Sequence, residues 1–538
     1  MKKVILPLMI GIILLTGCRS LKEDVAKQEY KRVTLFCDVE FWGAPLWDSS
    51  GDTITGEISR ETGATVEVID AVEDADKQLS MMLVKNNLPD IISVTDETVI
   101  SQLVTSGKVW SLDTFLETYK PDSHILKDFP EDIKHELIKR DGGWYVWPSH
   151  MSSPDNREDL QISDYYLNEI EYSWPMVIMW NKDLLSELNL DVSQLQSKEK
   201  IFEAFEKAEQ LTASDGKEIT PLLVDGENYK TCTLEFLRCT FGAERIDENG
   251  NSKDEFLQPE MKEALEFLNK TIRNGYMTAD QLMLSNSQIK PLLDSGQVLC
   301  FIGNYSNTGV NPEGWLSSGV ILSDSGAHPV YEQKLRRSTG WIQTFISKEC
   351  ENPEVVADFF DYMTSEEGQL KWVFGEEGVH YNCNEDGLIE ITEEGYEAQG
   401  NYKESGINTW WMFFNLDWSK SVIAPPKLST GETLDNNITC AFALNDNTRC
   451  IDATALQNVN AIYQGDTEYE QMEVQINQWK EKQVKQIILA ETDQAFEEEY
   501  AKLISGLEER QIEKLDSKKN VEYQKNCQEY EAFIEKVN

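Results

Sequence analysis

The amino-acid sequence predicts an α/β fold in two successive units, each with a sheet flanked by helices. Short apolar runs rich in β-branched residues alternate with segments whose apolar residues recur at helical spacing, and this alternation occurs twice along the 538 residues. Strands and helices that alternate in this way build parallel sheets, and such open sheets bind ligands at the carboxyl ends of their strands. Side chains that directly follow a predicted strand are therefore the first candidates for a binding site.

The first unit follows a polar N-terminal region. We expect strands at residues 33–39, 65–69 and 90–94, and helices at residues 53–62 and 74–86. Pro89 ends the second of these helices, because proline cannot continue a helical hydrogen-bond ladder.

The same pattern begins again at residue 176. Strands are expected at 176–180, 220–224 and 298–302, with helices at 198–210 and 259–274. A strand at 339–347 and a helix at 353–364 come next, and Pro353 suits the first turn of that helix. The end of the chain reads as purely helical from about residue 472, and we expect these helices to pack on the outside of one unit.

Residues 1–17 have the pattern of a lipoprotein signal peptide. Lys2 and Lys3 precede a short apolar run at 4–15, which is about half the roughly 20 residues that a transmembrane helix needs. Leu15-Thr16-Gly17-Cys18 resembles the bacterial lipobox, which implies acylation of Cys18, by palmitate for example, and a place on the outer face of the cell membrane. The alternative is an ordinary signal peptide followed by a chance cysteine. Residues 18–32 predict a flexible stalk.

Charge and cysteine content exclude several classes of protein. A net charge of −46 repels nucleic acid phosphates and anionic lipid headgroups, so neither is an expected partner. Cys232 and Cys239 lie too far apart on one expected helix to form a disulfide, whereas Cys440 and Cys450 flank a polar loop, and whether they pair stays open. The chain has no zinc-binding cysteine or histidine spacing. We therefore expect no metal and no cofactor.

Three segments together resemble a known family. They are Leu88-Pro89-Asp90-Ile91-Ile92, Trp180-Asn181-Lys182-Asp183-Leu184-Leu185, and residues 353–369, which begin Pro353-Glu354 and end Glu366-Glu367-Gly368-Gln369. In this order and behind a lipobox, they resemble the family-1 extracellular solute-binding proteins of ABC transporters. That group includes maltose-binding protein and the large Gram-positive LipO-type lipoproteins. The likeness covers nearly the whole mature chain.

The resemblance implies a two-lobed periplasmic-binding-protein-like fold of type II. Each lobe is a mixed sheet flanked by helices, extra helices follow at the C-terminus, and a hinge closes the lobes around a solute. Because the family's chain crosses between lobes more than once, we expect residues 33–150 with about 339–390 in lobe 1. Lobe 2 then contains about 151–338 and about 391–538. The implied partners of this monomer are a small solute and the permease subunits of an ABC transporter.

One departure from the family concerns calcium. Several large relatives carry a calcium loop just before the strand expected here at 220–224. Residues 212–218 are too few and too poor in oxygen ligands to surround an ion that takes 6–8 oxygens. A second acidic stretch, 247–254, predicts a hairpin turn instead.

Candidate ligand-binding residues follow from the chemistry of sugars, whose C–H faces stack on aromatic rings and whose hydroxyls pair with amides, carboxylates and histidines. Trp341 is favoured, because Gly340 before it lets a backbone approach closely. Asp96 has an equally good interpretation as a helix N-cap, and each tryptophan has one as a core ring. The full set, at or near strand ends or in the densest aromatic stretch, is Trp42, Trp47, Asp96, Trp147, His150, Trp180, Asn181, Asn304, Tyr305, Trp341, Trp410, Trp411 and Asn415.

The sequence favours carbohydrate capture over three alternatives. A lipid-anchored glycoside hydrolase is disfavoured, because the chain has no nucleophile elbow, and pairs among 95 acidic residues are uninformative. A receptor that presents its ligand to a membrane sensor uses the same cleft and stays open as an alternative. Peptide binding also stays open, although the aromatic richness of the chain favours sugars.

Overall fold

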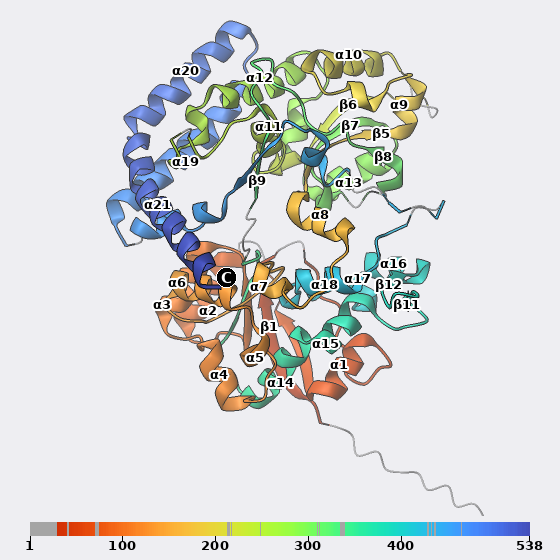
Figure 1. Ribbon diagram of the computed structural model, residues 1–538, viewed down its shortest axis with the longest axis vertical. Coiled ribbons are helices and arrows are strands. Elements are labelled where there is room, and N and C mark those ends of the chain that lie inside the picture. The colour runs from red at the N-terminus through yellow and green to blue at the C-terminus, as the bar shows by residue number, and fades with distance from the viewer. Residues whose placement is uncertain are drawn as a thin grey trace, which may run out of the picture.

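The computed structural model describes residues 29–537 apart from positions 40–41, 70, 72–74, 212–215, 217, 248, 309, 311, 334–338, 428–429, 432, 435–436 and 464. The signal peptide and Cys18 therefore lie outside the described residues, as does most of the segment 212–218 considered for calcium. The described chain forms two lobes, stacked one above the other in Figure 1.

Lobe 1 is the part of the molecule built on a five-stranded sheet of order β2-β1-β3-β10-β4. Its strands are β1 (Lys31–Cys37), β2 (Ala64–Ile69), β3 (Ile91–Val94), β4 (Trp147–Pro148) and β10 (Gln343–Ile346). Strands β2 and β3 pair with β1 in parallel, whereas β10 runs antiparallel to β3 and β4. The helices of lobe 1 are α1 (Ile54–Thr62), α2 (Ala75–Lys85), α3 (Glu97–Ser106), α4 (Leu112–Tyr119), α5 (Ile125–Asp128), α6 (Glu131–Asp141), α14 (Pro353–Thr364), α15 (Glu366–Gln369), α16 (Glu393–Gly400), α17 (Tyr402–Ser405) and α18 (Leu416–Val422).

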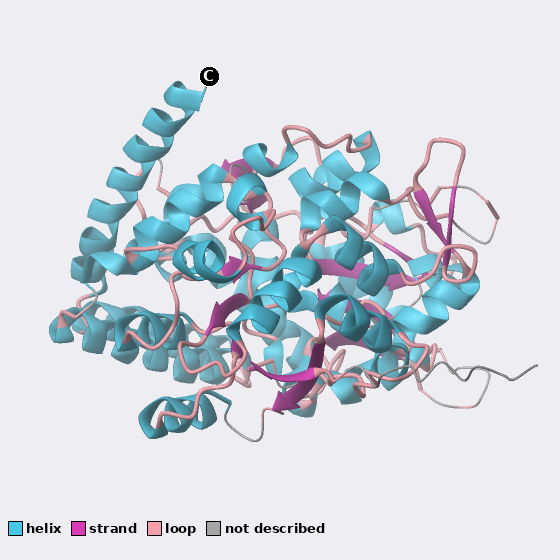
Figure 2. Cartoon of the chain, turned by 90° about the horizontal axis from the view of Figure 1, so that it is seen from below, coloured by secondary structure: helices cyan, strands magenta, loops and turns pink. Residues whose placement is uncertain are grey.

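Lobe 2 is built on a four-stranded sheet of order β6-β7-β5-β8. The strands are β5 (Met176–Asn181), β6 (Thr220–Val224), β7 (Val298–Asn304) and β8 (Trp315–Leu316). Helices α9 (Lys182–Glu187), α10 (Lys198–Glu209), α11 (Thr233–Phe241), α12 (Pro259–Arg273) and α13 (Asn286–Asp294) belong to this lobe. The expected two-lobed α/β fold, with a mixed sheet flanked by helices in each lobe, is confirmed, and Figure 2 shows helices around the strands.

Both sheets contain antiparallel strands, which the alternation of strands and helices in the sequence did not predict. β5 and β10 are the strands by which the chain enters each lobe after crossing from the other one. A strand that arrives from the neighbouring lobe starts at the edge where the parallel strands end, so it must run in the opposite direction. The sequence alternation predicts parallel strands only where a helix returns the chain along the face of the sheet.

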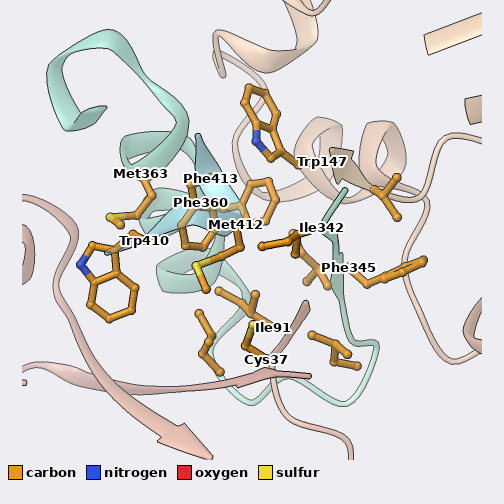
Figure 3. Close-up of a cluster of buried hydrophobic side chains, with 14 of the residues drawn as sticks. Cys37, Ile91, Trp147, Ile342, Phe345, Phe360, Met363, Trp410, Met412 and Phe413 are labelled. Atoms are coloured by element: carbon orange, nitrogen blue, oxygen red, sulfur yellow. The ribbon is translucent and has the colours of Figure 1, made fainter. Parts of the chain in front are cut away.

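The core of lobe 1 joins segments far apart in the sequence. Ile91, Phe345, Phe360 and Phe413 are fully buried and converge in Figure 3 together with Trp410. Trp410 and Phe413 follow residue 391, where we expected the chain to have returned to lobe 2. In the structure, residues 407–418 instead fill the lobe 1 core, because their rings pack on α14 and β10.

The chain passes between the lobes along three connections, at about residues 149–175, 323–342 and 423–440. Short helices α7 (Pro154–Arg157) and α8 (Asp164–Tyr172) lie on the first connection. Strand β9 (Val330–Gln333) lies on the second and pairs in parallel with β13 (Arg449–Asp452). The predicted turn at 247–254 has hairpin geometry, since Ile246 and Ser252 form an antiparallel bridge around it.

Three long helices end the chain: α19 (Thr467–Ile488), α20 (Asp493–Glu509) and α21 (Ile512–Val537). The first two pack on α12 of lobe 2, and their apolar face includes fully buried Leu503 and Leu507. Helix α21 then descends toward lobe 1 (Figure 1), where Lys139 of α6 donates to Asn526 at 2.7 Å and pairs with Glu529 at 2.5 Å. Among the described residues no helix is long and apolar enough to span a membrane.

Candidate functional site

A cavity of about 830 Å³ opens in lobe 1 beside β4 and the first interlobe connection. We call it the lobe 1 cavity. Its buried lining residues form an apolar and amide floor, and its exposed ones form a rim. The aromatic and apolar floor consists of Phe129, Trp147, Met151 and Trp418, each at most 7% exposed.

Three side-chain amides, from Asn156, Asn415 and Gln369, also line the lobe 1 cavity. The Asn156 and Asn415 amides exchange two hydrogen bonds, at 2.9 and 3.2 Å. The Gln369 side-chain oxygen accepts from the backbone N–H of Asn415 at 2.7 Å. Amides held in this reciprocal way keep a fixed orientation, which is what recognition of a hydroxyl pattern requires.

A buried carboxylate holds the wall of the cavity in place. Asp417 has no solvent exposure and accepts from the Ser152 hydroxyl at 2.8 Å and from the Ser153 backbone N–H at 3.0 Å. It also accepts from the Asn156 amide at 2.9 Å and faces Arg157 at 3.4 Å. These contacts tie the first interlobe connection to α18, so the floor of the cavity and the hinge segment form one unit.

A second group of predicted residues lies directly beside the residues that line the cavity. The His150 backbone N–H donates to Phe414, and Met151 pairs with Asn415. Met151 and Asn415 line the cavity, whereas Phe414 and His150, whose φ of +57° places it in a left-handed turn, are not among the lining residues. His150 packs on Phe414 at 4.7 Å between ring centroids.

Trp341 completes this group, and its indole N–H donates to His150 Nδ1 at 3.1 Å. Because Nδ1 accepts, the His150 ring is neutral there, and burial lowers its pKa to about 4. Trp341 remains 40% exposed. The prediction for Gly340 is confirmed in geometry: its φ is +64°, and a Cβ at this position would lie 1.5 Å from the Ser149 carbonyl oxygen.

Lobe 2 contributes Asn304 and Tyr305 at the carboxyl end of β7. The Asn304 side chain caps the turn by accepting from the Ser306 backbone N–H, and the backbone N–H of Asn304 donates to the Asp225 carboxylate at 3.0 Å. Tyr305 is half-buried, and burial raises the pKa of its hydroxyl. Met176, where the first connection enters lobe 2, pairs with Asn304, so this end of β7 faces the connection that leaves β4 near His150.

The other predicted residues make contacts within their own lobes, as helix caps or as parts of the cores. Asp96 caps α3 and Asn181 caps α9, each accepting from two backbone N–H groups, which confirms the N-cap interpretation of Asp96. The tryptophans lie in or against the cores: Trp42 donates to the Thr409 carbonyl, Trp47 to Ser59, Trp180 to Ser318 and Trp411 to Asn408, while Trp410 is fully buried.

The cavity also contains residues that sequence reasoning missed. Asn156 has no marked sequence context, and Gln369 lies in a motif that pointed to the family without pointing to a site. Five carboxylates line the cavity, and none was distinguishable among 95 acidic residues: Asp128, Asp155, Asp159, Glu366 and Glu367. Within the described part of the chain, no group of three or more His, Cys, Asp or Glu side chains is arranged to hold a metal ion.

Comparison with known proteins places the chain in a family. The family model described as bacterial extracellular solute-binding protein matches residues 55–375. The polygalacturonan/rhamnogalacturonan-binding protein YtcQ of Bacillus subtilis is 23% identical over 355 residues, which are 62% of this chain and 64% of that protein. The match therefore spans less than two thirds of the relative's length.

Solved structures show the same fold. The substrate-binding protein FusA of an S. pneumoniae ABC transporter, in complex with kestose, has a TM-score of 0.62 at 14% identity and covers 93% of this chain and 99% of its own. The N-glycan transport solute-binding protein NgtS of Streptococcus pneumoniae has a TM-score of 0.56 at 15% identity, with 92% and 99% covered. Family and fold are those of binding proteins. The resemblance seen in the sequence is confirmed, since more than half of the chain matches the family model, and the chain belongs to the bacterial extracellular solute-binding proteins.

Proposed function

We propose that this protein captures an oligosaccharide outside the cell and delivers it to an ABC importer, as a binding protein and not as an enzyme. The observation that carries the proposal is the lobe 1 cavity, in which buried aromatic rings and fixed amides share one floor. The printed names of the similar proteins add support, because they refer to polygalacturonan and rhamnogalacturonan, kestose and N-glycans.

The cavity suits the chemistry of a sugar. Trp147 and Trp418, 3% and 6% exposed, give the cavity an apolar floor beneath a sugar ring, and the amides of Asn156 and Asn415 both donate and accept hydrogen bonds. Carboxylates at the rim accept from sugar hydroxyls. A volume of about 830 Å³ lies within the range of small-molecule sites, so the cavity has room for several sugar units.

We further propose that the face formed by partly buried His150 and exposed Trp341 meets Asn304 and Tyr305 across the interlobe cleft when a ligand binds. Closure of two lobes around a ligand requires that the ligand bind the closed state better than the open one. Half-exposed aromatic groups at facing strand ends supply such additional contacts. We propose lobe boundaries near residues 150, 340 and 422, and an acylated Cys18 that anchors a monomeric protein to the outer face of the cell membrane.

The test is a thermal-shift screen of the purified full chain against neutral and acidic oligosaccharides, with amino acids and short peptides as controls. A ligand that binds only the folded state adds about 2.7 kcal/mol of stability at a hundredfold excess over Kd. We expect a shift with one class of glycan. Flat traces with every sugar and a response to peptides would refute the carbohydrate assignment.

Two variants localise the response. Trp147→Phe alters a ring that lines the cavity, whereas Trp144→Phe alters an equally buried ring that does not. Both substitutions shrink the same core, so both lower stability, but only Trp147→Phe should reduce the shift that the glycan produces. An equal loss of response in both variants would place the ligand elsewhere.

A further inference from the structure

Carboxylates surround the mouth of the lobe 1 cavity. Asp128 ends α5, Asp155 and Asp159 lie on α7 and just after it, and Glu366 and Glu367 form the first turn of α15. Four of the five are exposed and Asp155 is half-buried. Because all five carboxylates line one cavity, their negative charges act together on anything that enters.

Little positive charge offsets them among the described lining residues. Lys127 is exposed, and its ammonium group donates to the Asp122 carbonyl at 3.0 Å. Arg157 is close to the cavity but does not line it. Its guanidinium donates to the Ser152 hydroxyl at 2.6 Å and faces the buried Asp417 at 3.4 Å. The charge of Arg157 is therefore already matched by an internal carboxylate.

The floor beneath this rim is uncharged. Its rings and amides, including Trp147 and Gln369, satisfy the faces and hydroxyl edges of a neutral sugar, whose hydroxyls also donate to the rim carboxylates. A uronic acid replaces a hydroxymethyl group by a carboxylate, which accepts only and carries a like charge. Like charges placed together disfavour the wrong partner without affecting the right one.

We propose that the lobe 1 cavity selects glycans without carboxylates and rejects uronic acids, a specificity that rests on the carbohydrate-binding function proposed above. This specificity would distinguish the chain from the Bacillus subtilis relative, whose printed name refers to polygalacturonan and rhamnogalacturonan. The two chains share 23% identity over the matched region, so a change of ligand charge within the same fold is consistent with their divergence.

The test compares matched pairs of oligosaccharides that differ only by oxidation at C6, drawn from the galactose, glucose and mannose series. Calorimetric titration of the full chain gives Kd for each member at about 20 mM and about 500 mM salt. We expect the neutral member of a bound pair to bind at least tenfold more tightly at low salt. The difference should shrink at high salt, because the Debye length falls from tens of ångströms to a few ångströms.

A pair of double variants tests the rim directly. Glu366→Gln with Glu367→Gln removes two charges from the first turn of α15 at the cavity mouth. Glu393→Gln with Glu394→Gln removes two exposed charges from the equivalent turn of α16, away from the cavity. The ratio of uronate to neutral affinity should rise several-fold in the first variant and stay unchanged in the second.

The outcomes separate the two proposals. A uronate that binds more tightly than its neutral partner, or an equal ratio in both double variants, overturns the specificity and leaves carbohydrate binding intact. Absence of binding by every glycan, neutral or acidic, overturns the proposed function and the specificity with it.

Discussion

Replacement of Gly340 by alanine tests how the site face of lobe 1 is positioned. Gly340 lies at the end of the second interlobe connection, three residues before β10 and directly before Trp341. Its φ of +64° is disfavoured for any residue with a Cβ, at a cost of about 1–2 kcal/mol. In addition, an alanine Cβ would lie 1.5 Å from the Ser149 carbonyl oxygen and 2.7 Å from its carbon.

This overlap involves backbone atoms, so no rotamer change relieves it. Movement of Ser149 would strain its hydrogen bond to Ile342, at 2.9 Å, and the short pairing of β4 with β10. Each lost backbone hydrogen bond costs about 1 kcal/mol, so we expect a total loss of about 3–4 kcal/mol. Gly387→Ala is the matched control, because Gly387 has φ +81° and no atom within 4 Å of its added Cβ, and it should lose only about 1–2 kcal/mol.

Urea denaturation measures the difference in unfolding free energy between the two variants, with the same dependence of free energy on urea concentration used for both. The expected gap between them is about 2 kcal/mol, roughly two backbone hydrogen bonds. Glycan affinity should fall in Gly340→Ala and stay unchanged in Gly387→Ala, since only the first displaces Trp341 and His150. Equal stability losses in the two variants would contradict the close approach of the backbones.

Three further predictions concern charged and titrating groups. Glu332→Gln should cost about 1–3 kcal/mol in urea denaturation, because Arg238, only 1% exposed, loses the charge of one of its two carboxylate partners at 2.8 Å and keeps Glu235. The pKa of His150 is about 4, below the value of about 6.5 in an unfolded chain, so the unfolded state binds the proton first. Stability should therefore fall as pH drops from about 6.5 toward 4, and His150→Gln should lessen that fall when unfolding is measured at both ends. Lys139→Met removes a contact between α6 and α21 and should lower stability by about 1 kcal/mol, whereas the exposed-pair variant Lys200→Met should change it by less than about 0.5 kcal/mol.

Local chemistry explains the parts of the fold that the sequence predicted well. Thr53 and Gly63 cap α1 at its two ends, and Pro353 occupies the first turn of α14, so these helices begin and end at residues suited to those roles. Asp96 shows the limit of such reasoning. Its position after a strand indicated both a ligand contact and an N-cap, and the structure shows the cap.

The site itself depends on contacts that no local pattern contains. Trp147 of β4, Asn415 before α18 and Gln369 of α15 lie more than 200 positions apart at their extremes, yet they line one cavity. The burial of a tryptophan also depends on residues distant in the sequence: Trp180, near the end of β5, stacks on Phe205 and is fully buried, whereas Trp341, just before β10, is 40% exposed. Residue type and spacing indicate that a ring is near a sheet edge, and only tertiary packing decides which side it faces.

Helix α21 bears on how freely the lobes move. The Asn526 side chain is 2% exposed, and its amide donates to the carbonyls of Ala455 and Gln457 on the lobe 2 side while its oxygen accepts from Lys139 of lobe 1. A relative movement that separates α6 from α21 therefore breaks the contacts of one lysine but leaves the two lobe 2 hydrogen bonds intact. A partly exposed ion pair and one hydrogen bond together contribute about 1–2 kcal/mol, which a ligand offsets when it binds the closed state about 10- to 30-fold more tightly than the open one. Under the proposed closure, the contact between α21 and α6 therefore favours the described arrangement of the lobes by an amount that a ligand of this selectivity overcomes.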